Sequence, residues 1–212
     1  MERKGEQGTL NELEEQIVLG TTELIIRRPA DVESLIDEER FADREFLPYW
    51  AELWPSGLAL ARFVAGLDLR GNDVLELGCG LALPSLAAAL AGAAVTATDW
   101  APESIDLIRR NAHANGLSIA AQELDWAAPV DLDRYHVVLA ADVLYEERNV
   151  EPLLRLLDDA VAPGGVALFA DPGRRHAQAF FDRARGSGWS LELTATDELP
   201  SGSMVRLSRS AG

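Results

Sequence analysis

The chain is poor in the residues that build disulfides, metal sites and catalytic amines. Its 212 residues include 1 cysteine, Cys79, and 3 histidines, and Lys4 is the single lysine among 19 basic residues. One cysteine excludes an internal disulfide framework and a multi-cysteine metal site, and the scattered histidines lack metal-ligand spacing. Because Lys4 stands near the start, the body of the chain holds no lysine for catalysis. We therefore predict no metal and a reducing, cytoplasmic location.

Long apolar runs and positive charge are also scarce. The longest apolar run, 81–95, is shorter than the ~20 residues of a membrane span, and Pro84 and Gly92 interrupt it. Residues 1–10 are polar and charged, unlike a secretory signal. The formal net charge of -16, from 35 acidic and 19 basic residues, disfavours polyanionic partners. We expect a soluble, monomeric protein that binds neither nucleic acid nor membrane.

Short apolar runs alternate with helical patterns from about residue 57 onward. Five rounds of strand and helix predict a mostly parallel sheet with helices on both faces, and the short turn between the last two strands predicts an antiparallel pair. The fold class is therefore α/β, a Rossmann-like, doubly wound, seven-stranded sheet ending in a reversed strand. The expected strands are 74–77, 94–98, 119–124, 137–141, 166–170, 191–196 and 204–207, and the expected helices are 84–91, 102–115, 150–161 and 177–184.

Residues 1–46 differ from the rest in their high acidic content. We expect them to form a small N-terminal arm or lid packed on a main domain of residues 47–212. The arm is predicted to hold a strand at 23–28 and a short helix at 31–40, which Asp31 would cap. Its first ~10 residues are predicted to be disordered. Glu12, Glu14 and Glu15 are interpreted as a solvated acidic run.

Carboxylates and tryptophans follow the predicted parallel strands. In an open α/β sheet, ligands bind beyond the carboxyl ends of the strands. This crevice suits a ligand with hydroxyl groups, a cation and a flat ring. The residues there are Glu76, Gly78, Cys79 and Gly80 after the first strand, Asp99 and Trp100 after the second, Asp125 and Trp126 after the third, Ala141, Asp142 and Tyr145 after the fourth, and Asp171 after the fifth.

The glycine turn after the first strand does not fit the common phosphate-binding motifs. A G-x-G-x-x-G dinucleotide motif would need glycine where Leu83 stands, and a P-loop would need a lysine. Glu76 instead places negative charge near the turn, which favours a cationic ligand. Asp99 follows Glu76 by 23 residues, about the spacing at which an acid after the second strand binds ribose hydroxyls.

These motifs resemble known proteins over about residues 46–170. Glu76-Leu-Gly78-Cys-Gly80, Asp99 and Asp125-Trp126 resemble the cofactor site of class I, seven-strand methyltransferases that use S-adenosylmethionine. Trp54-Pro-Ser-Gly57 and Asp142-Val-Leu-Tyr145 are similar to the W-P-x-G and D-x-x-Y/F motifs of the family-16, METTL21-like protein lysine methyltransferases, a group that includes nicotinamide N-methyltransferase-like enzymes. One departure is Ala82, where many class I enzymes have a third glycine.

The resemblance implies a role for each motif residue. S-adenosylmethionine would be the cofactor and S-adenosylhomocysteine the product, and the methyl acceptor would be a protein lysine side chain. A small amine or pyridine-like acceptor, or a cofactor-binding module without catalysis, stays open as an alternative. The implied cofactor-binding residues are Trp54 at the pocket floor, Gly78, Cys79 and Gly80 at the methionine portion, Asp99 at the ribose, Asp125 and Trp126 at adenine, Ala141 near the sulfonium, and Glu76 and Trp100 beside them.

Asp142 and Tyr145 are the implied catalytic residues, facing the substrate nitrogen. Asp142 would orient the amine. Tyr145 would line the substrate channel and form a hydrogen bond with the nitrogen. Each residue also has a structural alternative. Asp142 could cap the next helix, and Tyr145, Trp54 and Trp126 could be packing residues.

Overall fold

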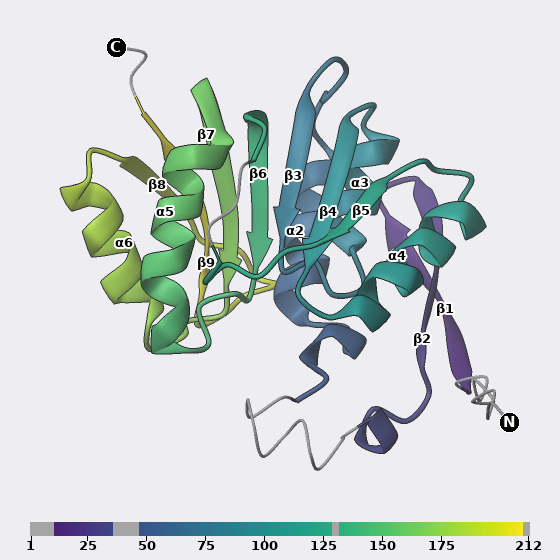
Figure 1. Ribbon diagram of the computed structural model, residues 1–212. Helices are drawn as coiled ribbons and strands as arrows, with labels where there is room; N and C mark the ends of the chain where they lie inside the picture. Colours follow the sequence, from purple (N-terminus) through teal and green to yellow (C-terminus); the bar gives the residue numbers. More distant parts are fainter. Residues whose placement is uncertain (1–10, 36–46, 129–131, 210–212) are drawn as a thin grey trace, which may run out of the picture.

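A seven-stranded sheet forms the centre of the computed structural model, which describes residues 11–35, 47–128 and 132–209 (Figure 1). The strand order is β5-β4-β3-β6-β7-β9-β8, and β9 alone runs antiparallel to its two neighbours. The predicted α/β, mostly parallel sheet with one reversed strand is therefore confirmed. The strands are β3 (Asp73–Leu77), β4 (Ala94–Asp99), β5 (Ala120–Glu123), β6 (Tyr135–Ala141), β7 (Val161–Asp171), β8 (Ser190–Thr194) and β9 (Ser203–Ser208).

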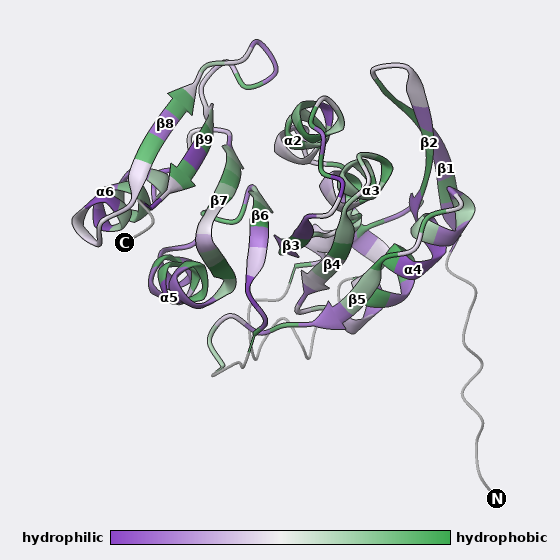
Figure 2. Ribbon diagram, turned by 90° about the horizontal axis from the view of Figure 1, so that it is seen from above, coloured by the Kyte–Doolittle hydropathy of each residue, from purple (hydrophilic) through white to green (hydrophobic). Residues whose placement is uncertain are grey.

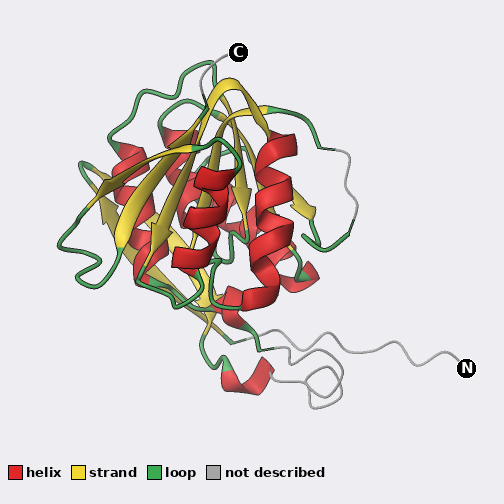
Figure 3. Cartoon of the chain, turned by 90° about the vertical axis from the view of Figure 1, so that its left-hand side faces the viewer, coloured by secondary structure: helices red, strands yellow, loops and turns green. Residues whose placement is uncertain are grey.

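Helices cover both faces of this sheet (Figures 2 and 3). Successive side chains of a strand point to opposite faces, so Val74 packs in the cluster with α2 and α3, whereas Leu75 packs in the cluster with α5 and α6. The helices are α2 (Pro55–Ala65), α3 (Leu83–Leu90), α4 (Pro102–Ala114), α5 (Val150–Ala160) and α6 (Ala177–Gly186), with short 3₁₀ turns η1 (Glu33–Leu35), η2 (Tyr49–Ala51) and η3 (Glu147–Asn149). None of the helices described is long and apolar enough to cross a membrane.

Some boundaries differ from the sequence-based expectation. Helix α5 ends at Ala160, and Val161 already pairs with Tyr135 as the start of β7. The pairing register then shifts past Pro163-Gly164-Gly165, where proline cannot donate to the ladder. The predicted helix at 31–40 appears only as η1, where Asp31 accepts a 3.2 Å hydrogen bond from the Ser34 N–H. Residues 36–40 and 1–10 lie outside the described residues.

The segment interpreted as a solvated acidic run is a strand. It forms β1 (Glu12–Leu19), which pairs with β2 (Thr22–Pro29), the strand predicted at 23–28, in an antiparallel hairpin. Each glutamate has an arginine partner: Glu12 contacts Arg110, Glu14 contacts Arg27 at 3.2 Å, and Glu15 contacts Arg28 at 2.5 Å. Leu19, Leu24 and Ile26 are buried in the cluster that includes α2 and α3.

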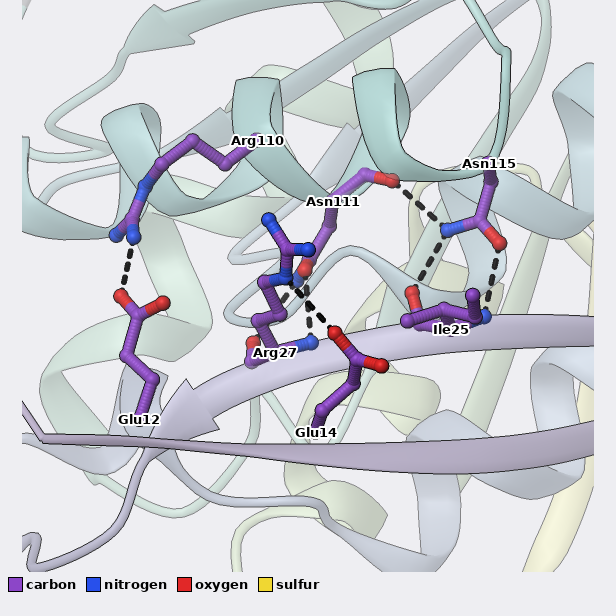
Figure 4. Close-up of polar contacts among 7 residues, drawn as sticks. All are labelled: Glu12, Glu14, Ile25, Arg27, Arg110, Asn111 and Asn115. Carbon is purple, nitrogen blue, oxygen red and sulfur yellow. Dashed lines mark hydrogen bonds and ion pairs between the residues drawn. The ribbon is translucent and has the colours of Figure 1, made fainter.

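Two asparagines dock the hairpin, Asn111 in the last turns of α4 and Asn115 directly after it (Figure 4). The Asn115 side chain accepts from the Ile25 N–H at 2.8 Å and donates to the Ile25 carbonyl at 2.7 Å. Asn111 makes the same two contacts with Arg27, at 2.8 and 3.1 Å. The two carboxamides therefore offer β2 the donors and acceptors that a neighbouring strand would offer.

Replacing Asn115 with alanine is expected to loosen the hairpin. The Ile25 N–H and carbonyl would lose their partners, at a cost of about 1–3 kcal/mol if water does not replace them. Urea unfolding measures that loss, and hydrogen exchange should speed up across residues 22–29. His113→Ala is the matched control, because His113 is an exposed residue in the last turn of α4. Unchanged stability and unchanged exchange in Asn115→Ala would show that this amide does not hold the hairpin.

Candidate active site

A cavity of about 410 Å³ lies at the carboxyl ends of β3, β4 and β6. Residues of η2 and η3, of the first turns of α2, α3 and α5, and of the segment after β5 also line it. The lining includes every predicted cofactor-binding and catalytic residue, whereas Asp171, which the sequence also placed in the crevice, is not part of it. The predicted residues in the lining are Trp54, Glu76, Gly78, Cys79, Gly80, Asp99, Trp100, Asp125, Trp126, Ala141, Asp142 and Tyr145.

The glycine turn after β3 is tightly constrained. Gly78 and Gly80 have φ angles of +63° and +52°, in the left-handed region that favours glycine. A Cβ atom on Gly78 would lie 2.8 Å from the Trp126 ring, and one on Gly80 would lie 3.1 Å from the Trp50 carbonyl oxygen. Ala82, the departure from the family pattern, also has a left-handed φ of +59°. Alanine therefore adopts here the conformation that glycine would adopt at lower cost.

Asp99 ties this turn to the end of β4. Its carboxylate is 3% exposed and accepts from the Gly80 N–H at 2.9 Å and from the Ala101 N–H at 3.0 Å. Burial raises the pKa of Asp99, while these backbone donors act in the opposite direction. The residue predicted to bind ribose hydroxyls thus also shapes the turn that faces the same cavity.

Glu76 is a second buried carboxyl at the cavity. Its side chain accepts from the Ser85 N–H at 2.8 Å and from the Ser85 hydroxyl at 2.5 Å. Burial raises the pKa of Glu76 to about 8, although the hydrogen bonds from Ser85 lower it. Glu76 is therefore mostly protonated at neutral pH, and a cationic ligand group nearby would favour its charged form.

The raised pKa of Glu76 predicts a pH dependence of stability. A carboxyl with a pKa of about 8 in the folded chain and about 4.5 unfolded stabilises the fold below the unfolded value. That stabilisation is lost as the pH rises through the folded value. The free energy of unfolding should therefore fall more steeply between pH 5 and pH 8 in the wild type than in Glu76→Gln, whose amide oxygen can still accept from Ser85. Urea titrations across that range measure both slopes, and equal slopes would contradict the prediction.

The residues after β4 and β5 form the cavity wall predicted for a flat ring. Trp126 is half-buried, packs at the edge of the α5–α6 cluster, and rests against Gly78. Its indole N–H is buried and has no hydrogen-bond partner among the described residues. Asp125 accepts from the Ala127 N–H at 2.9 Å, and Trp100 is 42% exposed. The indole N–H of Trp126 is a donor that an acceptor on a bound ligand could satisfy.

Aromatic side chains surround the other end of the cavity. The Tyr49 ring makes edge contacts with Tyr145 and Trp54, at centroid distances of 5.5 and 6.0 Å. The Trp54 indole donates to the Tyr49 carbonyl at 2.8 Å. Burial, as the largest cause, raises the pKa of Tyr145 to about 12, so its hydroxyl keeps its proton at neutral pH. Tyr49 was not among the predicted site residues.

Asp142 lies beside these rings in a left-handed conformation, with φ of +57°. Its N–H donates to the Ala170 carbonyl at 2.9 Å. Both of its carboxylate oxygens accept from Arg174, at 2.6 and 3.0 Å. Arg174 was not among the predicted site residues, although a usable signal was present, because it stands three residues after Asp171, at a strand end that was already placed in the crevice.

The fold and this cavity define a class I methyltransferase architecture. A Thermus thermophilus 16S rRNA N2 G1207 methyltransferase, solved with S-adenosylmethionine and guanosine, is 17% identical, covers 95% of this chain and 51% of its own, and has a TM-score of 0.71. Magnesium protoporphyrin IX methyltransferase from Synechocystis, solved with S-adenosylhomocysteine, is 22% identical over 74% of this chain and 84% of its own, with a TM-score of 0.58. At these identities the likeness shows the fold alone.

Sequence comparison identifies the family. The lysine methyltransferase family (Methyltransf_16) matches residues 49–186. EEF1A lysine methyltransferase 3 of Mus musculus is 33% identical over 157 residues, covering 70% of this chain and 67% of that protein. Protein N-lysine methyltransferase METTL21A of Danio rerio is 35% identical over 130 residues, covering 57% and 59%. The electron transfer flavoprotein beta subunit lysine methyltransferase of Danio rerio is 34% identical over 131 residues, covering 60% and 51%.

The chain belongs to the lysine methyltransferase family, within its METTL21-like group of S-adenosylmethionine-dependent enzymes. The predicted resemblance is thereby confirmed. The chain spans from about half to two thirds of the length of these curated relatives. In the parts of the chain that the structure describes, no group of three or more histidine, cysteine, aspartate or glutamate side chains is arranged to hold a metal ion.

Proposed function

We propose that this protein transfers a methyl group from S-adenosylmethionine to the side-chain nitrogen of a lysine in another protein. The observation that carries the proposal is the single cavity that gathers the glycine turn, Asp99, Trp126, Asp142 and Tyr145. The names of the relatives support a protein acceptor, because they refer to EEF1A and to the electron transfer flavoprotein beta subunit.

The cavity fits the cofactor by the chemistry of its lining. Gly78 and Gly80 would let the backbone approach the methionine portion, Asp99 would accept from the ribose hydroxyls, and the Trp126 indole N–H would find an acceptor. When bound, S-adenosylmethionine supplies a methyl group on a sulfonium sulfur, so that the amine lone pair forms the N–C bond while the S–C bond breaks and its electron pair stays on sulfur.

The chain's own residues would orient the amine and keep it dry. Tyr49, Trp54 and Tyr145 form an aromatic wall that would shield one side of a bound lysine side chain from water. Asp142 can accept a hydrogen bond from the amine and so fix its direction. Tyr145 keeps its proton because its pKa is about 12, so it can donate a hydrogen bond but does not serve as a base at neutral pH. The proton that the lysine ammonium must lose goes to water.

Methyl transfer into a cell lysate tests this proposal. Radiolabelled S-adenosylmethionine is added with the protein, and the label is then separated into protein and small-molecule fractions. We expect label in protein lysine, absent from reactions with Asp99→Ala. The control Lys4→Arg removes the single lysine of the chain and with it any self-labelling at lysine. Label found only in small molecules would overturn the proposal in favour of a small amine acceptor.

A further inference from the structure

The ends of β6 and β7 are joined by a side-chain pair, Asp142 and Arg174, of which Asp142 lines the cavity. Arg174 Nε donates to one oxygen of Asp142 at 2.6 Å, and Arg174 Nη2 donates to the other at 3.0 Å. The Asp142 side chain is 7% exposed and that of Arg174 is 38% exposed. Two parallel charge-assisted hydrogen bonds fix both the position and the rotation of the carboxylate.

Arg174 is itself held in place from two sides. The Asp171 carboxylate accepts from the backbone N–H groups of Gly173 and Arg174, both at 2.8 Å. The guanidinium carbon lies 5.9 Å from the centre of the Trp54 ring. The other Asp171 oxygen is buried without a hydrogen-bond partner among the described residues. The loop after β7 is therefore shaped to present this guanidinium to Asp142.

The pair changes the charge that a substrate amine meets. A lone buried carboxylate would favour the ammonium form of a lysine, because an opposite charge within about 4–6 Å raises the pKa of an amine by about 1–3 units. Only the neutral amine has the lone pair that the reaction needs. With Arg174 in contact, the nearby charges nearly cancel, yet each carboxylate oxygen keeps a lone pair for a hydrogen bond from the amine.

Other ionisable groups near the pair also contribute to the charge that the substrate amine meets. Asp171 and Tyr49 face the Arg174 guanidinium. The remaining charged or ionisable groups of the cavity wall are Glu52, Glu76, Cys79, Asp99, Asp125, Tyr145, Glu146 and Arg148. These groups stay constant in variants of Asp142 and Arg174, so differences between those variants report on the pair itself.

We propose that Arg174 is a positioning residue that orients Asp142 and cancels its charge, so that Asp142 does not hold the substrate lysine in its ammonium form. This inference rests on the proposed function, and it assigns to Arg174 a part in that reaction. It predicts that removing Arg174 and removing the Asp142 charge shift the pH dependence of the reaction in opposite directions. Loss of the guanidinium leaves a carboxylate that favours ammonium, whereas loss of the carboxylate charge leaves a guanidinium that disfavours it.

The test is the pH profile of kcat for single and double variants. In Arg174→Gln the midpoint of the rise in kcat should move up by about one pH unit, and in Asp142→Asn it should move down by about one unit. In the double variant, which lacks both charges, the midpoint should return to within a few tenths of the wild type. Arg174→Lys should keep the wild-type midpoint, because it keeps the charge, with a lower kcat because it loses the bidentate geometry.

Arg183→Gln is the matched control, because Arg183 pairs with Glu151 on the exposed surface of α6 and α5. Its midpoint should not move. Thermal unfolding and cofactor affinity identify any variant that fails to fold. If Arg174→Gln fails to fold, the double variant and Arg174→Lys still test the inference. Midpoints that shift in the same direction, or not at all, would overturn the inference.

A second measurement does not need turnover. The ¹⁵N chemical shift of labelled n-butylamine, bound to the protein with S-adenosylhomocysteine, reports whether the bound amine is protonated. Across a pH titration, we expect the bound amine to lose its proton about one pH unit lower in the wild type than in Arg174→Gln. Equal midpoints in the two proteins would overturn the inference even if the lysate experiment supports lysine methylation. The expected difference together with no label in protein would instead overturn the proposed function alone.

Discussion

Replacing Asp99 with alanine is expected to weaken S-adenosylmethionine binding by about 100-fold, the effect of about 2.7 kcal/mol. The substitution removes the predicted acceptor for the ribose hydroxyls. It also removes the acceptor of the Gly80 and Ala101 N–H groups, so the glycine turn is no longer hydrogen-bonded to the end of β4. Isothermal titration calorimetry measures the affinity, and the melting temperature should fall in the same variant.

Two control variants separate ligand contact from turn geometry. Asp99→Asn keeps one carbonyl acceptor for a backbone N–H, so it should retain more stability than Asp99→Ala while still losing affinity. Asp106→Ala removes an exposed carboxylate of α4 that pairs only with Arg109 in the described contacts, and it should bind the cofactor normally. An affinity within threefold of the wild type in Asp99→Ala would show that this carboxylate does not bind the cofactor.

Replacing Asp142 with alanine is expected to lower kcat by about 100-fold or more while the cofactor affinity stays within twofold of the wild type. The amine would lose its acceptor, and the Arg174 guanidinium would lose both of its hydrogen bonds to the carboxylate. Turnover on the labelled protein substrate measures the first effect, and calorimetry measures the second.

Asp182→Ala is the control for this change, because Asp182 pairs with Arg185 on the exposed side of α6. It should leave turnover unchanged. A wild-type rate in Asp142→Ala would remove Asp142 from the reaction. Equal losses of turnover and cofactor binding would instead indicate that Asp142 acts by shaping the loop after β6, where its own backbone is left-handed.

The sheet could be predicted because its inner strands, such as β3 and β6, are largely buried and are separated by clear turn signals. The strand β1 could not, because its glutamates gave the appearance of a solvated segment. Each glutamate in fact contacts an arginine, on β2 or on α4, and these pairings depend on the tertiary fold. Helix α2 was also missed, although Pro55 in its first turn and the helical spacing of the apolar residues Leu60 and Val64 were usable signals.

Because ligands bind at strand ends, the sequence could predict the cofactor-binding and catalytic residues that line the cavity, although Asp171, predicted by the same rule, lies outside the lining. The same rule could not predict the pair of Asp142 and Arg174, because that contact depends on the path of the loop after β7. Hydrogen bonds from Gly173 and Arg174 to Asp171 set this path, and sequence spacing does not reveal them. Tyr49 was missed for a similar reason, since η2 brings it to the cavity from before the sheet begins.

The way the hairpin is docked allows the side chains of β2 to change over evolutionary time. The hydrogen bonds from Asn111 and Asn115 to β2 all go to main-chain atoms, which every amino acid except proline supplies in the same form. Substitutions of the side chains at Ile25 and Arg27 therefore leave the docking bonds in place. The hairpin can acquire a new surface charge or shape while it stays anchored to the catalytic domain by the same two amides.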